Sequence, residues 1–204
     1  GNKSQKMRYK YSVIFSQYYM DEEKVKKLIR ELIIEIGEDP TREGLARTPE
    51  RIVGVYKEIF NGYEADSELS VQFSEDSEIV IVRDIQFYSM CEHHLLPFFG
   101  KIQIVYSPDG RVFGISKLVR LVEKFSRRLQ IQERLTKNIA DELYAEGVKG
   151  VAVLTEAEHL CMKMRGVRNN ANVTSAAFRG IYERKEEKER IVELIKNPKK
   201  SSFL

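Results

Sequence analysis

Two short stretches of this 204-residue chain hold all of its cysteine and histidine residues. The first contains Cys91, His93 and His94, and the second contains His159 and Cys161. Thiolate and imidazole groups are ligands that zinc prefers, and catalytic zinc sites typically combine three protein ligands with one open position for water. Cys91, His94 and Cys161 make such a set of two cysteines and one histidine, so the sequence predicts a metal site.

Other interpretations of these residues are open. A single Cys-x-x-His pair is weak support for a metal, and lone cysteines often serve as small buried apolar residues. A disulfide would need an oxidising compartment, and residues 1–20 lack the continuous apolar segment of a secretory signal. The gathering of every cysteine and histidine into two clusters favours the metal site, and it leaves His93 and His159 beside the ligands.

Composition limits the class of protein. Apolar residues make up 42% and charged residues 32% of the chain, which is ordinary for a soluble globular protein. The formal net charge of +3 is too small to indicate a nucleic-acid partner. No apolar run approaches the roughly 18 residues of a membrane helix. We therefore expect a cytoplasmic protein that binds neither nucleic acid nor membrane.

The N-terminal part of the chain is expected to be helical. Residues 1–20 form a poorly defined segment. Asp21 is a suitable N-cap for a helix that Gly37 ends, and Thr48-Pro49 provides a cap and a first-turn proline for a second helix. With the loop or linker expected at 63–77, residues 21–77 make a helical arm and linker.

From residue 78 the pattern changes to alternating, β-branched segments. The segments expected to form strands are 79–88, 101–106, 111–115, 151–155, 159–165 and 173–178, and those expected to form helices are 117–128 and 131–146. Strands, then helices, then strands indicate an α+β domain with an antiparallel sheet and two helices on one side. This domain covers 78–182, and a charged helix and tail occupy 183–204.

The expected strand at 159–165 would give the second cluster a geometry. Side chains two residues apart in a strand share a face, so His159, Cys161, Lys163 and Arg165 would point the same way. That face would carry a proton-transfer group, a metal ligand and two cations. For Lys163, a solvent-facing polar edge is the simpler interpretation.

A basic segment lies between the two clusters. Residues 111–137 contain eight lysines and arginines but only two glutamates. Ser116 could cap the helix that begins at Lys117, whose free N–H groups and dipole favour an anion. A solvated basic face is the alternative. Glu133 could pair with Lys137, or its carboxylate could accept two N–H bonds from the edge of a guanine.

Four motifs together resemble the GTP cyclohydrolase I family in order and spacing. They are Cys91-Glu92-His93-His94, Gly114–Arg120, Gln130–Thr136 and His159-Leu160-Cys161. The similarity extends from about residue 47 to residue 180. It implies the tunnelling fold, in which antiparallel sheets of neighbouring subunits join into a barrel. It also implies a homo-oligomer, usually a decamer of two pentamers, with active sites between subunits.

The resemblance also implies roles for individual residues. The zinc ligands would be Cys91, His94 and Cys161, and the acid–base groups His93 and His159, with Ser116 as a further candidate for proton movement. Guanine would be held by Glu133, with Gln132 and the backbone of Ile131 beside it. The triphosphate would be bound by Lys117, Arg120 and Arg165 in the region of Ser116, and by Arg51 from another subunit.

The implied reaction is the zinc-dependent hydrolysis and rearrangement of GTP to 7,8-dihydroneopterin triphosphate, with release of formate. A hydrolase of this kind acts on a cyclic amidine and starts folate or tetrahydrobiopterin biosynthesis. Zinc activates water at neutral pH, and His159 would protonate the opening imidazole ring. The sequence shows neither which of the two pathways the product enters nor whether a regulatory partner binds.

Three rival functions are less well supported. Nitrile reductases and pterin synthases of the same fold need a nucleophilic cysteine with a nicotinamide, or a three-histidine zinc site, and this sequence has neither set. A structural zinc in a basic, non-catalytic module usually has four protein ligands. Zinc deaminases carry His-x-Glu and Pro-Cys-x-x-Cys motifs, which this sequence lacks.

Overall fold

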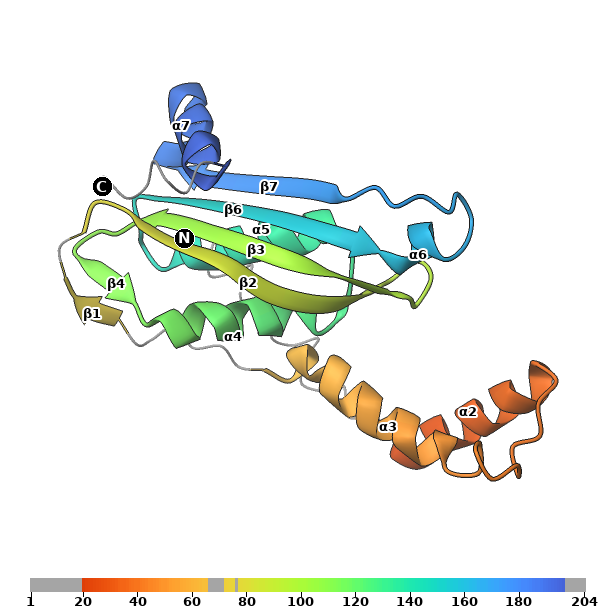
Figure 1. Ribbon diagram of the computed structural model, residues 1–204. Coiled ribbons are helices and arrows are strands. Elements are labelled where there is room, and N and C mark those ends of the chain that lie inside the picture. Colours follow the sequence, from red (N-terminus) through yellow and green to blue (C-terminus); the bar gives the residue numbers. More distant parts are fainter. Residues whose placement is uncertain (1–19, 66–71, 76, 197–204) are drawn as a thin grey trace, which may run out of the picture. The chain divides into compact units, whose positions relative to one another are not determined.

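The computed structural model describes residues 20–65, 72–75 and 77–196 (Figure 1). The chain divides into two compact units, one that ends at Ala65 and one that begins at Asp66. The expectations for residues 1–19, for the linker at 66–71 and 76, and for the tail at 197–204 lie outside the described residues.

The N-terminal unit contains two helices, α2 (Glu22–Glu35) and α3 (Thr48–Ile59), followed by the 3-10 turn η1 (Asn61–Tyr63). As predicted, Asp21 caps α2 by accepting a hydrogen bond of 3.0 Å from the Lys24 N–H. The prediction that Thr48 caps α3 is wrong by one residue. The Thr48 N–H already bonds to the Leu45 carbonyl, so the helix begins at Thr48 and its N-cap is Arg47, without a side-chain cap.

The second unit is built on a five-stranded sheet with the order β5-β2-β3-β6-β7. Its strands are β2 (Val80–Cys91), β3 (Pro97–Ser107), β5 (Leu129–Gln130), β6 (Gly150–His159) and β7 (Val173–Gly180). The pairs β2–β3, β3–β6 and β6–β7 are antiparallel, whereas β5 runs parallel to β2. The sheet is therefore mixed rather than purely antiparallel, because the chain reaches β5 through a crossover helix.

Helices α4 (Ile115–Ser126) and α5 (Gln132–Ala145) cover one face of this sheet (Figure 1). Their apolar sides join the inner residues of the strands in one core, in which Ile102, Leu121 and Ile139 have no exposed surface. On the other face, α7 (Lys185–Lys196) packs Ile191 against Val105 and Ala152. Among the described helices, none has the length and apolar character that crossing a membrane requires.

A second, two-stranded sheet differs from the expected loop. Strand β1 (Gln72–Ser74), within the segment predicted to be a loop, pairs with β4 (Arg111–Phe113). Strand β4 ends before residue 115 because Gly114, in an extended conformation, is the N-cap of α4. Ser116 therefore lies in the first helical turn, and the prediction that it caps this helix is wrong.

The strand predicted at 159–165 is also wrong. Strand β6 ends at His159, which pairs with Phe98, the second residue of β3. Beyond that pair β6 has almost no partner strand left to bond, because β3 begins at Pro97 and β7 pairs only as far as Ala157. The chain instead closes one helical turn, α6 (Leu160–Lys163), so the four polar side chains do not share one strand face.

The close approach of β3 and β6 predicts that any side chain at position 100 would destabilise the protein. A Cβ atom at this position would lie 1.9 Å from the Glu156 carbonyl oxygen. Overpacking typically costs about 1–3 kcal/mol, and a clash with backbone cannot be relieved by a side-chain rotation. We expect Gly100→Ala to lower the free energy of unfolding, measured by urea denaturation, by at least this amount.

Gly54 provides the matched control for Gly100. It lies inside α3, and a Cβ atom there would meet nothing within 4 Å. Since alanine favours a helix interior over glycine by about 0.5–1 kcal/mol, Gly54→Ala should leave stability unchanged or raise it. Equal stability of the two variants would contradict the strand contact at Gly100.

Candidate metal centre

The first two ligands are brought together by a tight turn at the end of β2. The Leu95 N–H bonds to the Cys91 carbonyl at 2.9 Å, and the Cys91 N–H bonds to the Leu96 carbonyl at 2.9 Å. Leu95 closes the turn with a positive φ of 51°, a conformation that is uncommon for leucine. His94 is thereby folded back over Cys91, with its Nδ1 atom 3.8 Å from the Cys91 Sγ atom.

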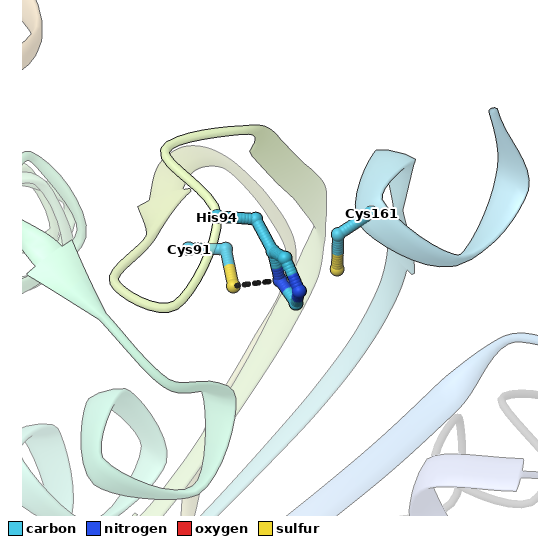
Figure 2. A group of neighbouring side chains, drawn as sticks. All are labelled: Cys91, His94 and Cys161. Carbon is cyan, nitrogen blue, oxygen red and sulfur yellow. Dashed lines mark hydrogen bonds between the residues drawn. The ribbon is translucent and has the colours of Figure 1, made fainter. Parts of the chain in front are cut away.

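The third ligand comes from α6. Figure 2 shows the Cys161 side chain pointing toward Cys91 and His94. One ligand atom from each of the three residues lies within 4.8 Å of the others, close to the span that one zinc ion with bonds of about 2.0–2.3 Å can bridge. Within the described part of the chain, no fourth histidine, cysteine or carboxylate joins this group.

The chemistry of the group suits a transition metal. Both cysteines are free thiols, so no disulfide competes for the sulfur atoms. Burial, together with the neighbouring Cys91 sulfur, raises the pKa of the Cys161 thiol. A divalent cation acts in the opposite direction because it stabilises the thiolate form. A cation bound by Cys91 and Cys161 would therefore hold both sulfurs as thiolates.

A second layer of contacts holds the turn in place. The Glu92 N–H bonds to the Gln130 carbonyl of β5, and the Glu92 carboxylate accepts two bonds from Arg134, at 2.5 and 3.1 Å. The hydrogen bond and charge of Arg134 lower the pKa of Glu92. Sequence reasoning missed this pair, because 42 residues separate the partners and no periodicity relates a turn to a distant helix.

His159 lies beside the metal group as the last residue of β6. Its ring stacks on Phe98, with centroids 4.8 Å apart and the planes inclined by 2°. Its Nε2 atom is 2.8 Å from the Gln132 Oε1 atom. Burial lowers the pKa of His159, and the nearby Glu133 carboxylate opposes that shift. The ring is thus held by a stack and a hydrogen bond.

His93 occupies a different environment from His159. Its side chain is 65% exposed, and its Nε2 atom lies 4.0 Å from the Glu92 carboxylate. The rings of His93 and His94 are nearly perpendicular, with centroids 6.2 Å apart. His93 is therefore next to the metal group without belonging to it.

Several of the predicted substrate contacts lie at the same end of the sheet. Ile131 is the N-cap of α5, and Glu133 is exposed in the first turn of that helix. Arg165 follows α6, and its positive charge acts to lower the pKa of Cys161. The Gln132 side chain, in contrast, points inward and is only 1% exposed.

The structure does not bring the predicted phosphate-binding residues of α4 to this place. Ser116, Lys117 and Arg120 lie at the start of α4, whereas its end leads to β5, which pairs with Cys91. Ser116 is about 15 Å from that end along the helix, at 1.5 Å per residue. Arg51 is exposed on α3, in the N-terminal unit.

Comparisons with known proteins identify the family. Residues 25–196 match the model of the family described as GTP cyclohydrolase I. A GTP cyclohydrolase 1 from Hyperthermus butylicus is 52% identical over 179 residues, covering 85% of this chain and 92% of that protein. Another from Clostridium kluyveri is 50% identical over 184 residues, covering 87% and 99%. A third, from Aquifex aeolicus, is 51% identical over 165 residues, covering 80% and 90%.

A solved structure, the archaeosine synthase QueF-Like in the apo form, is a remote likeness. It is 17% identical with a TM-score of 0.43, covering 52% of this chain and 97% of that one, which is too distant to support a conclusion.

Fold and site define an α+β protein with a three-ligand Cys–His–Cys group suited to a transition metal. The match to the family model and the sequence identity to its members identify the protein more specifically than the fold and site do. The chain belongs to the GTP cyclohydrolase I family, and it is an enzyme of that family.

The metal centre predicts that zinc content and activity are lost together. Replacing Cys161 with serine removes a soft ligand from a set of only three, so the variant should purify with little zinc and release no formate from GTP. Metal content can be measured by inductively coupled plasma mass spectrometry. Stoichiometric zinc in all three single variants, at Cys91, His94 and Cys161, would disprove the ligand set.

Proposed function

We propose that this enzyme uses zinc to hydrolyse and rearrange GTP to 7,8-dihydroneopterin triphosphate, with release of formate. The observation that carries the proposal is the group of Cys91, His94 and Cys161, which offers three ligands and has no fourth protein ligand among the described residues. An open position is characteristic of catalytic rather than structural zinc. Zinc bound there would supply Lewis acidity and activate water at neutral pH.

The guanine end of the substrate is proposed to lie between the metal group and the start of α5. Glu133 is exposed there and close enough to His159 to influence its pKa. A carboxylate can accept two hydrogen bonds from adjacent N–H groups, which guanine presents on one edge. The Ile131 backbone, at the N-cap position of α5, and Gln132 lie beside it.

Proton transfer is proposed to involve both histidines outside the ligand set. His159 is partly buried and held in place, so it is the better candidate to protonate the imidazole nitrogen as the purine ring opens. A positioned acid–base group of this kind contributes roughly 10²–10⁴-fold to the rate. His93 and Ser116 are proposed to move protons at the ribose.

The triphosphate is proposed to bind at a site shared between subunits. Arg165 lies near Cys161, but Ser116, Lys117 and Arg120 lie at the far end of α4 in the same chain. A neighbouring subunit that presents the start of its α4 to this metal group would complete the site. Arg51 is proposed to reach the phosphates of another subunit in the same way, as a charge-assisted donor.

The sheet edges agree with such an assembly. Within the described residues, β7 pairs only with β6, and β5 covers only Met90 and Cys91 of β2. Long unpaired edges are normally paired or protected. We propose that they join between subunits into the barrel of the tunnelling fold, in a decamer of two pentamers. The enzyme would act in the cytoplasm at the start of folate or tetrahydrobiopterin synthesis.

The direct test of the proposed reaction is incubation of the zinc-loaded protein with GTP. Formate should appear together with a product that becomes a fluorescent pterin after oxidation. Neither should form with the Cys161→Ser variant. Formate without a pterin would limit the activity to ring opening and would overturn the rearrangement step.

Substrate specificity predicts the effect of changing Glu133. If Glu133 holds the guanine edge, Glu133→Gln replaces one acceptor with a donor and leaves a substrate N–H unpaired, which typically costs about 1–3 kcal/mol. The kcat/KM for GTP should fall roughly five- to 150-fold while zinc content stays the same. Glu142→Gln, on the same helix but paired with Lys124, is the matched control. Unchanged discrimination between GTP and ATP in the Glu133 variant would contradict the assignment.

The shared site predicts complementation between two inactive variants. Lys117→Ala and His159→Ala each remove one part of the site, and by the proposal those parts come from different chains. After mixing under conditions of subunit exchange, some sites inherit both intact residues, so activity should partly return. The pair of Arg51→Ala and His159→Ala should behave alike. No recovery despite exchange proven by mass spectrometry would disprove the shared site.

A further inference from the structure

A small group of buried polar side chains lies behind His159. Gln132 is 1% exposed, and Thr136 and Thr155 have no exposed surface. Gln132 and Thr136 are one turn apart on α5, while Thr155 and His159 lie four residues apart on β6, where an even spacing places side chains on the same face. Buried polar groups need hydrogen-bond partners, so the direction of each bond can be worked out.

The orientation of the Gln132 amide follows from its acceptors. One amide atom lies 2.8 Å from the Val173 carbonyl oxygen, 3.1 Å from the Thr155 carbonyl oxygen and 3.0 Å from the Thr155 hydroxyl. Carbonyl oxygens only accept, so this atom must be the Nε2 donor. The Oε1 atom is therefore the one that faces His159.

The two hydroxyls form a directed chain. The Thr136 Oγ1 atom is 2.8 Å from the Gln132 carbonyl oxygen, to which it must donate. The Thr136 and Thr155 hydroxyls are 2.8 Å apart. Because Thr136 has used its single proton, Thr155 donates to Thr136 and accepts from Gln132 Nε2. Every donor in the chain then has an acceptor, so no alternative orientation of the amide satisfies the group equally well.

This series of hydrogen bonds determines which nitrogen of His159 carries a proton. Since Gln132 Oε1 can only accept, the His159 Nε2 atom at 2.8 Å must carry a proton. In a neutral imidazole the other nitrogen then has a free lone pair, and His159 Nδ1 has no hydrogen-bond partner among the described residues. We propose that Gln132, held by Thr155 and Thr136, is a positioning residue that fixes neutral His159 as the Nε2–H tautomer, so that Nδ1 is the nitrogen that takes up a proton from water and then delivers it to the substrate.

The last part of this inference rests on the proposed function, because only a substrate gives Nδ1 a group that receives the proton. It also refines the role of Gln132. The amide acts on the substrate through His159, and its side chain does not bind guanine directly. In the other tautomer the basic lone pair would lie on Nε2, facing the Gln132 Oε1 atom, in a ring that the stack on Phe98 holds in plane.

The tautomer can be observed directly by nitrogen NMR. The zinc-loaded protein is labelled with ¹⁵N-histidine and measured at a pH where the imidazoles are neutral. The chain has only three histidines, and His159→Gln assigns the signal of interest. We expect His159 to show a protonated Nε2 and an unprotonated Nδ1. The opposite tautomer in the wild-type protein would overturn the proposal without any variant.

Two matched variants test the cause. Gln132→Met removes the acceptor at nearly constant volume, so the His159 signals should shift toward a mixture of tautomers. Gln130→Met is the control, because Gln130 is also buried but donates to the Phe125 carbonyl, and its Oε1 atom has no partner among the described residues. It should leave the His159 signals unchanged. The same tautomer in the Gln132 variant and the wild type would disprove positioning by Gln132.

Kinetics separates positioning from substrate contact. With zinc content unchanged, Gln132→Met should lower kcat roughly ten- to 100-fold, within the contribution of a positioned acid–base group, and leave KM for GTP nearly constant. A rise in KM with unchanged kcat would instead make Gln132 a direct substrate contact. Failure of the proposed function would appear separately, as wild-type protein without formate release but with the expected tautomer.

Discussion

The pairing of β3 with β6 is the constraint on which the site depends. At its last step, Phe98 lies opposite His159, and this single register position stacks the histidine on a buried aromatic ring. Beyond it, only Pro97 of β3 remains opposite β6, and the chain turns into α6, which carries Cys161. A shift of the register by one residue would turn His159 to the other face of the sheet and move Cys161 away from Cys91.

The metal group is placed by elements that also make contacts of their own. The turn after β2 is closed by backbone bonds to Cys91 and tied to α5 through Glu92 and Arg134. The rest of the second unit has a continuous apolar core between the sheet and two helices. The positions of the three ligands are therefore supported by backbone bonds, an ion pair and apolar packing in addition to any bond to a metal.

The buried polar groups beside this site orient the Gln132 amide and, through it, the ring of His159. Burying an amide and two hydroxyls is costly unless each is hydrogen-bonded. Here the backbone carbonyls of two neighbouring strands, at Thr155 and Val173, fix one end of the Gln132 amide. The orientation of the other end follows, and it reaches the ring of His159. The positions of two sheet carbonyls thus determine which nitrogen of His159 carries the proton.

The cationic residues at the start of α4 are separated from the metal group of the same subunit. The start of α4 and the metal group lie apart in one subunit, because about 15 Å of helix separates Ser116 from the end of α4, where the chain returns beside Cys91. One subunit thus presents its metal group and its α4 cations at different places. An enzyme assembled in this way would depend on its oligomer for activity, and loss of assembly would then resemble loss of a catalytic residue.

The sequence determined the chemistry of this protein, because that chemistry is written in residue types and local spacing. The metal ligands could be chosen from so few cysteines and histidines, and the family motifs are contiguous. Helices α2, α3, α4 and α5 were predictable within a few residues from the sequence pattern, although Asp21 is the one predicted cap that the structure confirms. Tertiary structure alone decided where β6 has no further partner strand. For that reason the segment that was expected to continue as a strand forms a helical turn. Tertiary structure also decided that Gln132 turns inward and that Arg134 meets Glu92, because contacts between residues 27 or 42 positions apart depend on how sheet and helices pack and leave no signal in local sequence.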